Sequence, residues 1–290
     1  MSLELPHITA PDDEAEAGGI SPRVAGRGAS ASSRLVGIGL PIVVFALAIG
    51  LWEFIVRVNG IEPFILPAPS VVIATLIKDW GTLSLSLLVT LRTMAIALLL
   101  ATFGGVLIAV IFAQSRLVER SLYPFAVILQ VTPIVAIAPL LLVYLNSGTA
   151  ILVCAFIVAF FPILSNTTLG LNSTDRNLRD LFKLYGAGSW RELVLLRAPS
   201  ALPYFLGGLR IAGGLALIGA VVAEIAAGSA GQGSGLAYRI VESGYRLNIP
   251  RMFAALLLIS LTGVLVYAIL ALVSHLLLRR WHESAFERGG

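Results

Sequence analysis

Six apolar runs, each long enough to cross a lipid bilayer, constrain this chain more than any other feature of its sequence. A helix rises ~1.5 Å per residue, so about 20 apolar residues span the hydrocarbon core. Backbone groups in lipid must be satisfied within their own segment, and each run is therefore predicted to be a transmembrane helix. The runs are Leu35–Val56, Leu83–Ala113, Leu122–Leu145, Ala150–Leu169, Leu202–Ala227 and Met252–Leu278.

The composition supports an all-α integral membrane protein. Hydrophobic residues make up 58% of the chain, charged residues only 12%, and the mean hydropathy is +0.93. A soluble domain of this size could neither bury nor expose so much apolar surface. The net charge of +4 does not indicate nucleic-acid binding, because the basic residues are scattered at the ends of the apolar runs.

The chain is predicted to have two parts. Residues 1–33 are rich in Pro, Gly, Ser and Ala and carry an acidic run without apolar periodicity, which is typical of a disordered tail. Residues 34–290 are predicted to form the transmembrane domain, with a core at about 83–278. A signal peptide is not expected, because the first apolar run begins only at Leu35.

Arginine and lysine predict the orientation of the spans. In an alternating six-span arrangement, most of the 20 basic residues fall on one side, and short cytoplasmic segments are enriched in them. Residues 1–33, 114–121, 171–200 and 279–290 are therefore predicted to be cytoplasmic, and so are both termini.

A charged segment, residues 171–200, separates the fourth and fifth runs. Asp175 is predicted to cap a short amphipathic helix that ends at Gly186. Ser189 and Glu192 have the spacing of a capping box for a second helix, which Pro199 is expected to close. From this pattern alone the segment is either a docking element for a protein in the cytoplasm or an amphipathic loop on the lipid headgroups.

The spacing in this segment resembles the E-A-A-x3-G-x9-I-x-L-P loop of permease subunits in binding-protein-dependent ABC importers. The consensus is loosely kept: the acidic residue is shortened, both alanines are larger apolar residues, and alanine replaces leucine. The resemblance implies coupling to an ATPase subunit, and the residues assigned to it are Asp180, Leu181, Phe182, Gly186, Ser189, Glu192, Leu196 and Pro199, with Ala198 at the leucine position.

Further stretches are similar to permeases of the nitrate/sulfonate/taurine type, over roughly residues 60–278. They include FILPAPS, VTPIVAIAPLLLVY, FFPILSNT and LPYFLGGLRIAGGLALIGAVVAEI. The resemblance implies the type I ABC importer permease fold in a bacterial cytoplasmic membrane. It also implies a second permease subunit, in a homodimer, with two ATP-binding subunits and a periplasmic or lipid-anchored solute-binding protein.

The chain carries no ATPase signature of its own. A P-loop needs Gly-Lys-Ser/Thr, and neither Lys78 nor Lys183 follows a glycine. ATP and magnesium are therefore expected on the partner subunit. The chain itself is not expected to be an enzyme or to bind a cofactor or metal, because His7, His275 and His282 are far apart and no activated nucleophile is evident.

Charges and prolines inside the runs are the remaining candidates for function. Arg92 and Glu224 are both expected in the outer half of the membrane, where they are predicted to pair; alternatively Arg92 or Arg210 contacts an anionic solute. Pro133 and Pro139 either kink a helix that lines the path or are merely tolerated.

Two other functions remain open from sequence. A secondary transporter would show inverted repeats and mid-membrane ionisable residues, and a membrane anchor for a cytosolic partner would not need kinked, glycine-rich spans. The transported solute is expected to be small and polar or anionic, such as nitrate, bicarbonate, a sulfonate, taurine or a pyrimidine-like compound.

Overall fold

The computed structural model describes residues 31–228 and 234–286, and every regular element within these ranges is a helix. The chain divides into two compact units, Met1–Gly50 and Leu51–Gly290. Most of α1 (Ala31–Val58) belongs to the first unit. Of the tail predicted at 1–33, residues 1–30 lie outside the described part, and α1 already begins at Ala31.

Within the described ranges, five helices are long and apolar enough to cross a membrane. A sixth candidate is a bent pair, α4 (Arg116–Val131) and α5 (Ile134–Tyr144), so counting the pair as one span gives the predicted six. The five are Gly39–Val58 in α1, Trp80–Gln114 (α3), Ser147–Asn172 (α6), the continuous helix Ser189–Ala227, and Ile249–Arg279 in α11, which extends over Ile249–Phe286.

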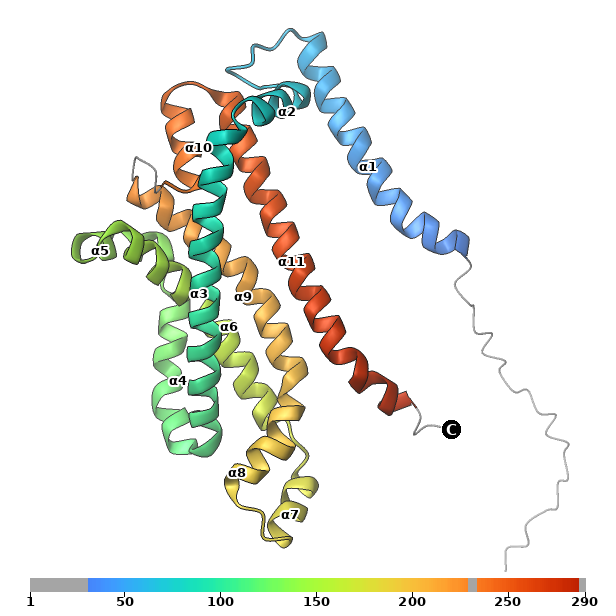
Figure 1. The fold of residues 1–290 in the computed structure, drawn as a ribbon, viewed down its shortest axis with the longest axis vertical. Coiled ribbons are helices and arrows are strands. Elements are labelled where there is room, and N and C mark those ends of the chain that lie inside the picture. Colours follow the sequence, from blue (N-terminus) through green and yellow to red (C-terminus); the bar gives the residue numbers. More distant parts are fainter. Residues whose placement is uncertain (1–30, 229–233, 287–290) are drawn as a thin grey trace, which may run out of the picture. The chain divides into compact units, whose positions relative to one another are not determined.

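The predicted third span, Leu122–Leu145, is divided into two helices, as the kink left open for Pro133 and Pro139 allows. The chain bends by 97° between α4 and α5, and Pro133 is the N-cap of α5. Proline offers no amide hydrogen and disfavours a helical residue before it, so α4 ends at Val131 and Thr132 is extended. Pro139 lies inside α5, which turns away from α4 (Figure 1).

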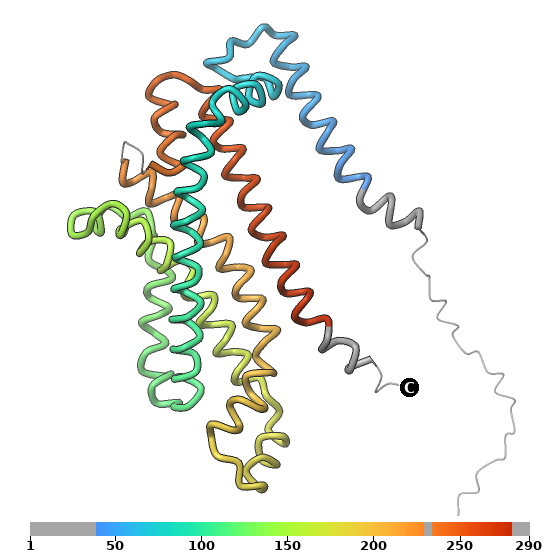
Figure 2. Tube along the Cα trace, in the orientation of Figure 1, coloured from blue at the N-terminus to red at the C-terminus, as the bar shows by residue number. Residues whose placement is uncertain are grey.

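The second unit is built around the contact between α6 and α9 (Ala198–Ala227), which pack against each other along their lengths and can be followed in Figures 1 and 2. Glycines allow the close approach. A Cβ on Gly219 would lie 2.9 Å from Cα of Ala155, and one on Gly208 would lie 2.7 Å from the Pro162 carbonyl oxygen. Small residues therefore bring the two helices together.

Short helices lie at both ends of the second unit (Figure 1). At one end, α2 (Pro69–Lys78) and α10 (Leu236–Tyr245) pack on α3 and α11 through buried residues including Val72, Leu83 and Leu236. We call this the α10 end. At the opposite end lie α7 (Arg176–Leu184) and α8 (Ser189–Glu192), and we call this the α8 end. Residues 229–233, shortly before α10, lie outside the described part.

Candidate functional site

The first half of the charged segment folds as the sequence predicts. The side chain of Asp175 accepts a hydrogen bond from the Asn177 amide at 2.9 Å, which caps α7. At the other end of α7, Gly186 has φ +70 and its amide donates to the Lys183 carbonyl, while the Ala187 amide donates to the Phe182 carbonyl. These two bonds form a Schellman motif, in which glycine readily takes the left-handed position.

The predicted capping box of the second helix is wrong. Gly188, not Ser189, is the N-cap of α8, and no side chain caps it. The Glu192 carboxylate instead accepts a hydrogen bond from Nε of Arg179 at 2.6 Å, and Glu192 is buried. Because Arg179 lies on α7, this ion pair holds α7 against α8. A partner from another helix has displaced the local backbone contact that the spacing indicated.

Pro199 does not close the second helix. The chain continues from α8 through a π-helical turn, Leu193–Arg197, directly into α9, and Pro199 lies in the first turn of α9. The Ala198 amide bonds to the Leu193 carbonyl, five residues back. A π turn of this kind shifts the hydrogen-bond pattern just before a residue that has no amide hydrogen, so the helix passes the proline without ending.

Arg197, which ends the π turn, ties three helices together. Its side chain is only 4% exposed. Its guanidinium donates to the Leu171 carbonyl at 2.9 Å, to the Ala113 carbonyl at 2.7 Å and to Oδ1 of Asn172 at 2.9 Å. Ala113 and Leu171 lie at the C-terminal ends of α3 and α6, where carbonyl groups lack partners within the helix and attract a cation.

The α7–α8 pair leaves an apolar surface uncovered. Leu184 and Tyr185 are 85% and 83% exposed, and Leu181 is also exposed, while Phe182 is half-buried. Asp180 forms an exposed ion pair with Lys183 at 3.2 Å. Of the residues assigned to the loop, Leu196 is half-buried in the π turn and Ser189 is exposed on α8. The segment therefore presents apolar side chains from a scaffold that Glu192 and Arg197 hold in place.

At the α10 end, Glu224 of α9 is the centre of a second buried polar cluster. Its side chain is 3% exposed. The carboxylate accepts hydrogen bonds from the Thr90 hydroxyl of α3 at 2.8 Å and from the Ala237 amide of α10 at 3.1 Å. The Leu236 amide donates to the same Thr90 hydroxyl oxygen at 2.9 Å. An anion is thus placed against the first amides of α10, where a helix N-terminus favours negative charge.

The predicted pair of Arg92 with Glu224 is wrong. Arg92 is exposed on α3 and has no hydrogen-bond or ion-pair partner among the described residues. Residues two apart on a helix do not share a face, so Arg92 points away from Thr90 and Glu224. Matching depth and opposite charge predicted the pair, but the rotation of α3 about its axis excludes it.

The other intramembrane arginine has a different environment. The guanidinium of Arg210 on α9 lies over the ring of Tyr267 on α11, 5.8 Å from its centroid. The Nε atom is buried without a hydrogen-bond partner in the described part of the chain. A cation held against an aromatic face in this way is compensated within the protein.

Sequence reasoning missed Arg197 and Thr90, and it also missed a polar pair on α10. Arg239 donates to Oγ of Ser86 at 2.9 Å and to Glu242 at 2.8 Å, and this hydrogen bond lowers the pKa of Glu242 below its ordinary value. The sequence does hold a signal for Arg197, because this charged residue lies between the apolar residues Leu193–Leu196 and the apolar run Leu202–Ala227. The described residues contain no group of His, Cys, Asp or Glu side chains placed to bind a metal.

Comparisons with known proteins agree with this architecture. Residues 101–280 match the family described as "Binding-protein-dependent transport system inner membrane component". The formylaminopyrimidine transport permease protein of Halalkalibacterium halodurans is 34% identical over 243 residues, covering 82% of this chain and 94% of that protein. The riboflavin transport system permease protein of Chloroflexus aurantiacus is 33% identical over 259 residues, covering 85% of this chain and 91% of that protein.

A solved chain from the crystal structure of an amino acid ABC transporter with histidines shares the fold. The TM-score is 0.57 at 16% identity, and the match covers 70% of this chain and 97% of that chain. The family match excludes the two alternative functions that the sequence left open, a secondary transporter and a membrane anchor. The chain therefore belongs to the inner membrane components of binding-protein-dependent transport systems and is the permease subunit of an ABC importer, which works with an ATP-binding subunit and a solute-binding protein.

Proposed function

We propose that this permease imports a small polar or anionic solute. It works as a homodimer bound to two ATP-binding subunits. Helices α7 and α8 contact those subunits and transmit their movement to the membrane helices. The observation that carries the coupling role is the exposed apolar surface of α7, held by the Arg179–Glu192 pair against a helix that continues into the membrane. Apolar side chains exposed at the end of a helix bundle, outside its apolar spans, require a protein or lipid partner. A continuous helix from Ser189 to Ala227 transmits a displacement of α8 along its length.

The turn at Gly186 gives a direct test of coupling. Valine at this position must adopt φ +70, which strains a β-branched residue and changes the direction in which α8 follows α7. We expect Gly186→Val to insert and dimerise normally while ATP-binding subunit association, or ATP hydrolysis stimulated by the binding protein, falls about 10-fold. That factor corresponds to the ~1–2 kcal/mol strain of a left-handed residue.

Gly188→Val is the matched control. A Cβ at Gly188 likewise meets nothing within 4 Å, but its φ of −69 suits any residue. Wild-type association, stimulation and transport in Gly186→Val would show that the α7–α8 turn is a surface loop without a coupling role. Equal losses in both variants would assign the effect to added bulk instead of to the turn.

The coupling role requires the α8 end to face the cytoplasm. The excess of arginine and lysine around residues 114–121 and 171–200 supports this orientation. A cysteine introduced at Ser189, which is exposed, should resist a membrane-impermeant thiol reagent added to intact cells and react after permeabilisation. Labelling from outside would reverse the proposed orientation.

Arg92 supports an anionic or strongly polar solute. An unpaired arginine within a membrane span is unfavourable unless it faces water or a partner. Arg92 shares a face of α3 with Leu85, Leu88 and Val89, which line a pocket of ≈740 Å³ towards the α10 end. Side chains tilt towards the N-terminus of their helix, so the Arg92 side chain extends towards this pocket.

Substitution of Arg92 tests the charge of the solute. The solute is first identified as the compound that the cognate binding protein retains through purification. We expect Arg92→Gln to lower uptake of that compound about 10-fold at unchanged ATP-binding subunit content. Arg210→Gln is the control, because Arg210 is already compensated by Tyr267. A cationic or apolar solute, or equal uptake by Arg92→Gln and wild type, would contradict an anion-contacting role.

A further inference from the structure

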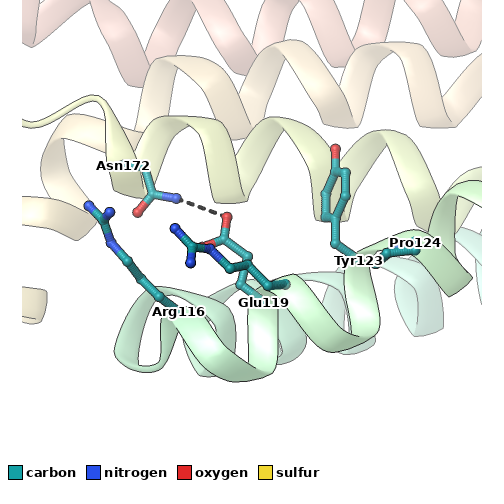
Figure 3. A pocket seen from close by; sticks show the side chains of 6 residues that line it. Arg116, Glu119, Tyr123, Pro124 and Asn172 are labelled. Atoms are coloured by element: carbon teal, nitrogen blue, oxygen red, sulfur yellow. Dashed lines mark hydrogen bonds between the residues drawn. The ribbon is translucent and has the colours of Figure 1, made fainter.

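A pocket of ≈430 Å³ lies where the first turns of α4 face the end of α6, and no residue of α7 or α8 lines it. Figure 3 shows Asn172 of α6 reaching across to Glu119 of α4, with Arg116 beside them and Tyr123 one turn further along α4. The lining residues are Arg116, Glu119, Arg120, Tyr123, Pro124 and Asn172.

Two of these residues carry positive charge that nothing in the described chain neutralises. Arg116 and Arg120 are one helical turn apart, both are exposed, and neither has a hydrogen-bond or ion-pair partner among the described residues. The one carboxylate in the pocket, Glu119, accepts a hydrogen bond from the Asn172 amide at 3.4 Å. The pocket therefore carries a net positive charge, and guanidinium groups are well suited to binding phosphate.

Two neighbouring groups strengthen this positive field. The pocket opens at the N-terminus of α4, a helix of 16 residues that Ser115 caps, so the positive end of its dipole faces the same space. The buried Arg197 donates to Oδ1 of Asn172 and adds a third cation behind the pocket. An anion in the pocket would meet cations from two directions.

One face of α4 is apolar and exposed. Leu117 and Phe125 are 77% and 64% exposed, and Leu122 is also exposed. In a membrane protein these side chains meet hydrocarbon, while the arginines at the end of the same helix lie at the level where the apolar part of α3 ends, at Gln114. The site thus combines a phosphate-binding end with an adjoining hydrocarbon-facing surface, which is the chemistry of a phospholipid.

We propose that this pocket binds the headgroup phosphate of an anionic phospholipid from the leaflet at the α8 end, with its acyl chains along the exposed face of α4. Basic pockets between membrane helices bind anionic headgroups in this manner. This proposal requires only that the chain is a membrane permease with this fold. It does not depend on the identity of the solute or on the coupling role of α7 and α8.

The test measures lipid binding to the purified full chain in a neutral detergent, without ATP-binding subunits or solute. Short-chain phosphatidylglycerol is titrated against wild type and against Arg116→Gln/Arg120→Gln, and binding is followed by native mass spectrometry and by the shift in thermal unfolding. We expect about 30-fold weaker binding in the double variant, because each cation near an anionic surface contributes about a fivefold factor. Short-chain phosphatidylcholine should bind weakly to both.

Two variants keep this result interpretable. Arg176→Gln/Arg191→Gln removes two exposed arginines from α7 and α8 and should bind phosphatidylglycerol like wild type. Arg116→Lys/Arg120→Lys keeps both charges and should retain most of the binding, which separates loss of the site from loss of the fold.

Three outcomes would overturn the proposal. Equal phosphatidylglycerol binding by wild type and Arg116→Gln/Arg120→Gln would exclude these arginines as the site. Inorganic phosphate that binds as tightly as the lipid would identify a site for a soluble anion. Unchanged lipid binding, together with lost association of the double variant with the ATP-binding subunits in a separate pull-down, would identify the pocket as a protein contact.

Discussion

At each end of the long Ser189–Ala227 helix, a buried ionisable side chain binds the ends of neighbouring helices, and the two side chains have opposite charges. At the α8 end, the Arg197 guanidinium is bound by carbonyl oxygens from the C-terminal ends of α3 and α6. At the α10 end, the Glu224 carboxylate is bound by the Thr90 hydroxyl and by an amide at the N-terminus of α10. In each case a buried charge satisfies the end of a neighbouring helix, and its sign matches the dipole there.

The two ends differ in the number of hydrogen bonds that the buried side chain makes and in the number of helices that it joins. Arg197 makes three hydrogen bonds to two other helices, and its neighbour Glu192 binds α7 through Arg179. Glu224 makes two hydrogen bonds and shares the Thr90 hydroxyl with the Leu236 amide. The α8 end is therefore expected to be the more rigid connection, and the α10 end the one that separates at lower free energy.

Loss of Arg197 tests the stronger connection. Arg197→Ala removes a charged donor and leaves helix-end carbonyl groups at Ala113 and Leu171 without their partner, so we expect a loss of ~2–4 kcal/mol in the free energy of unfolding. Thermal unfolding of the purified permease in detergent measures this loss. Arg176→Ala, at an exposed position on α7, should unfold like wild type. If the two variants are equally stable, Arg197 does not anchor the α8 end.

Loss of Glu224 should have a smaller effect, confined to the α10 end. Glu224→Ala leaves the buried Ala237 amide unsatisfied and should cost ~1–3 kcal/mol, whereas Glu224→Gln keeps one acceptor oxygen and should cost less. Hydrogen exchange at the amides of α10 reports the local effect, and Glu62→Ala is an exposed control. The proposed difference between the two ends would be contradicted by two results together: unchanged hydrogen exchange in α10, and a loss in the free energy of unfolding as large as that of Arg197→Ala.

The smallest effect is expected from Glu242, which holds Arg239 and Arg246 on α10. The hydrogen bond from Arg239 lowers the pKa of Glu242, so the stabilisation is present above the ordinary carboxyl pKa and is lost as the pH falls through the lower, folded-state value. Glu242→Gln should abolish this acid dependence, at under ~1 kcal/mol. The measurement is the free energy of unfolding as a function of pH in the acid range. The same pH dependence in Glu242→Gln and wild type would contradict the role of Glu242.

The sequence alone determined the parts of this fold that depend on local chemistry. Apolar runs of sufficient length predicted the spans, because lipid forces each segment to satisfy its own backbone. The cap at Asp175 and the left-handed turn at Gly186 were also correct, since both depend on residues within a few positions of each other. The loosely kept loop motif identified the family, which the match to residues 101–280 confirms.

Only the tertiary structure decided which distant groups meet. Glu192 had the spacing of a local cap and binds Arg179 instead, and Glu224 matched Arg92 in depth but faces Thr90. Pro133 bends its span, whereas Pro199 lies in a continuous helix because a π turn precedes it. The physical reason is the same in each case. Sequence spacing gives the position of a residue along its helix, but the rotation of that helix against its neighbours determines which partners its side chain reaches.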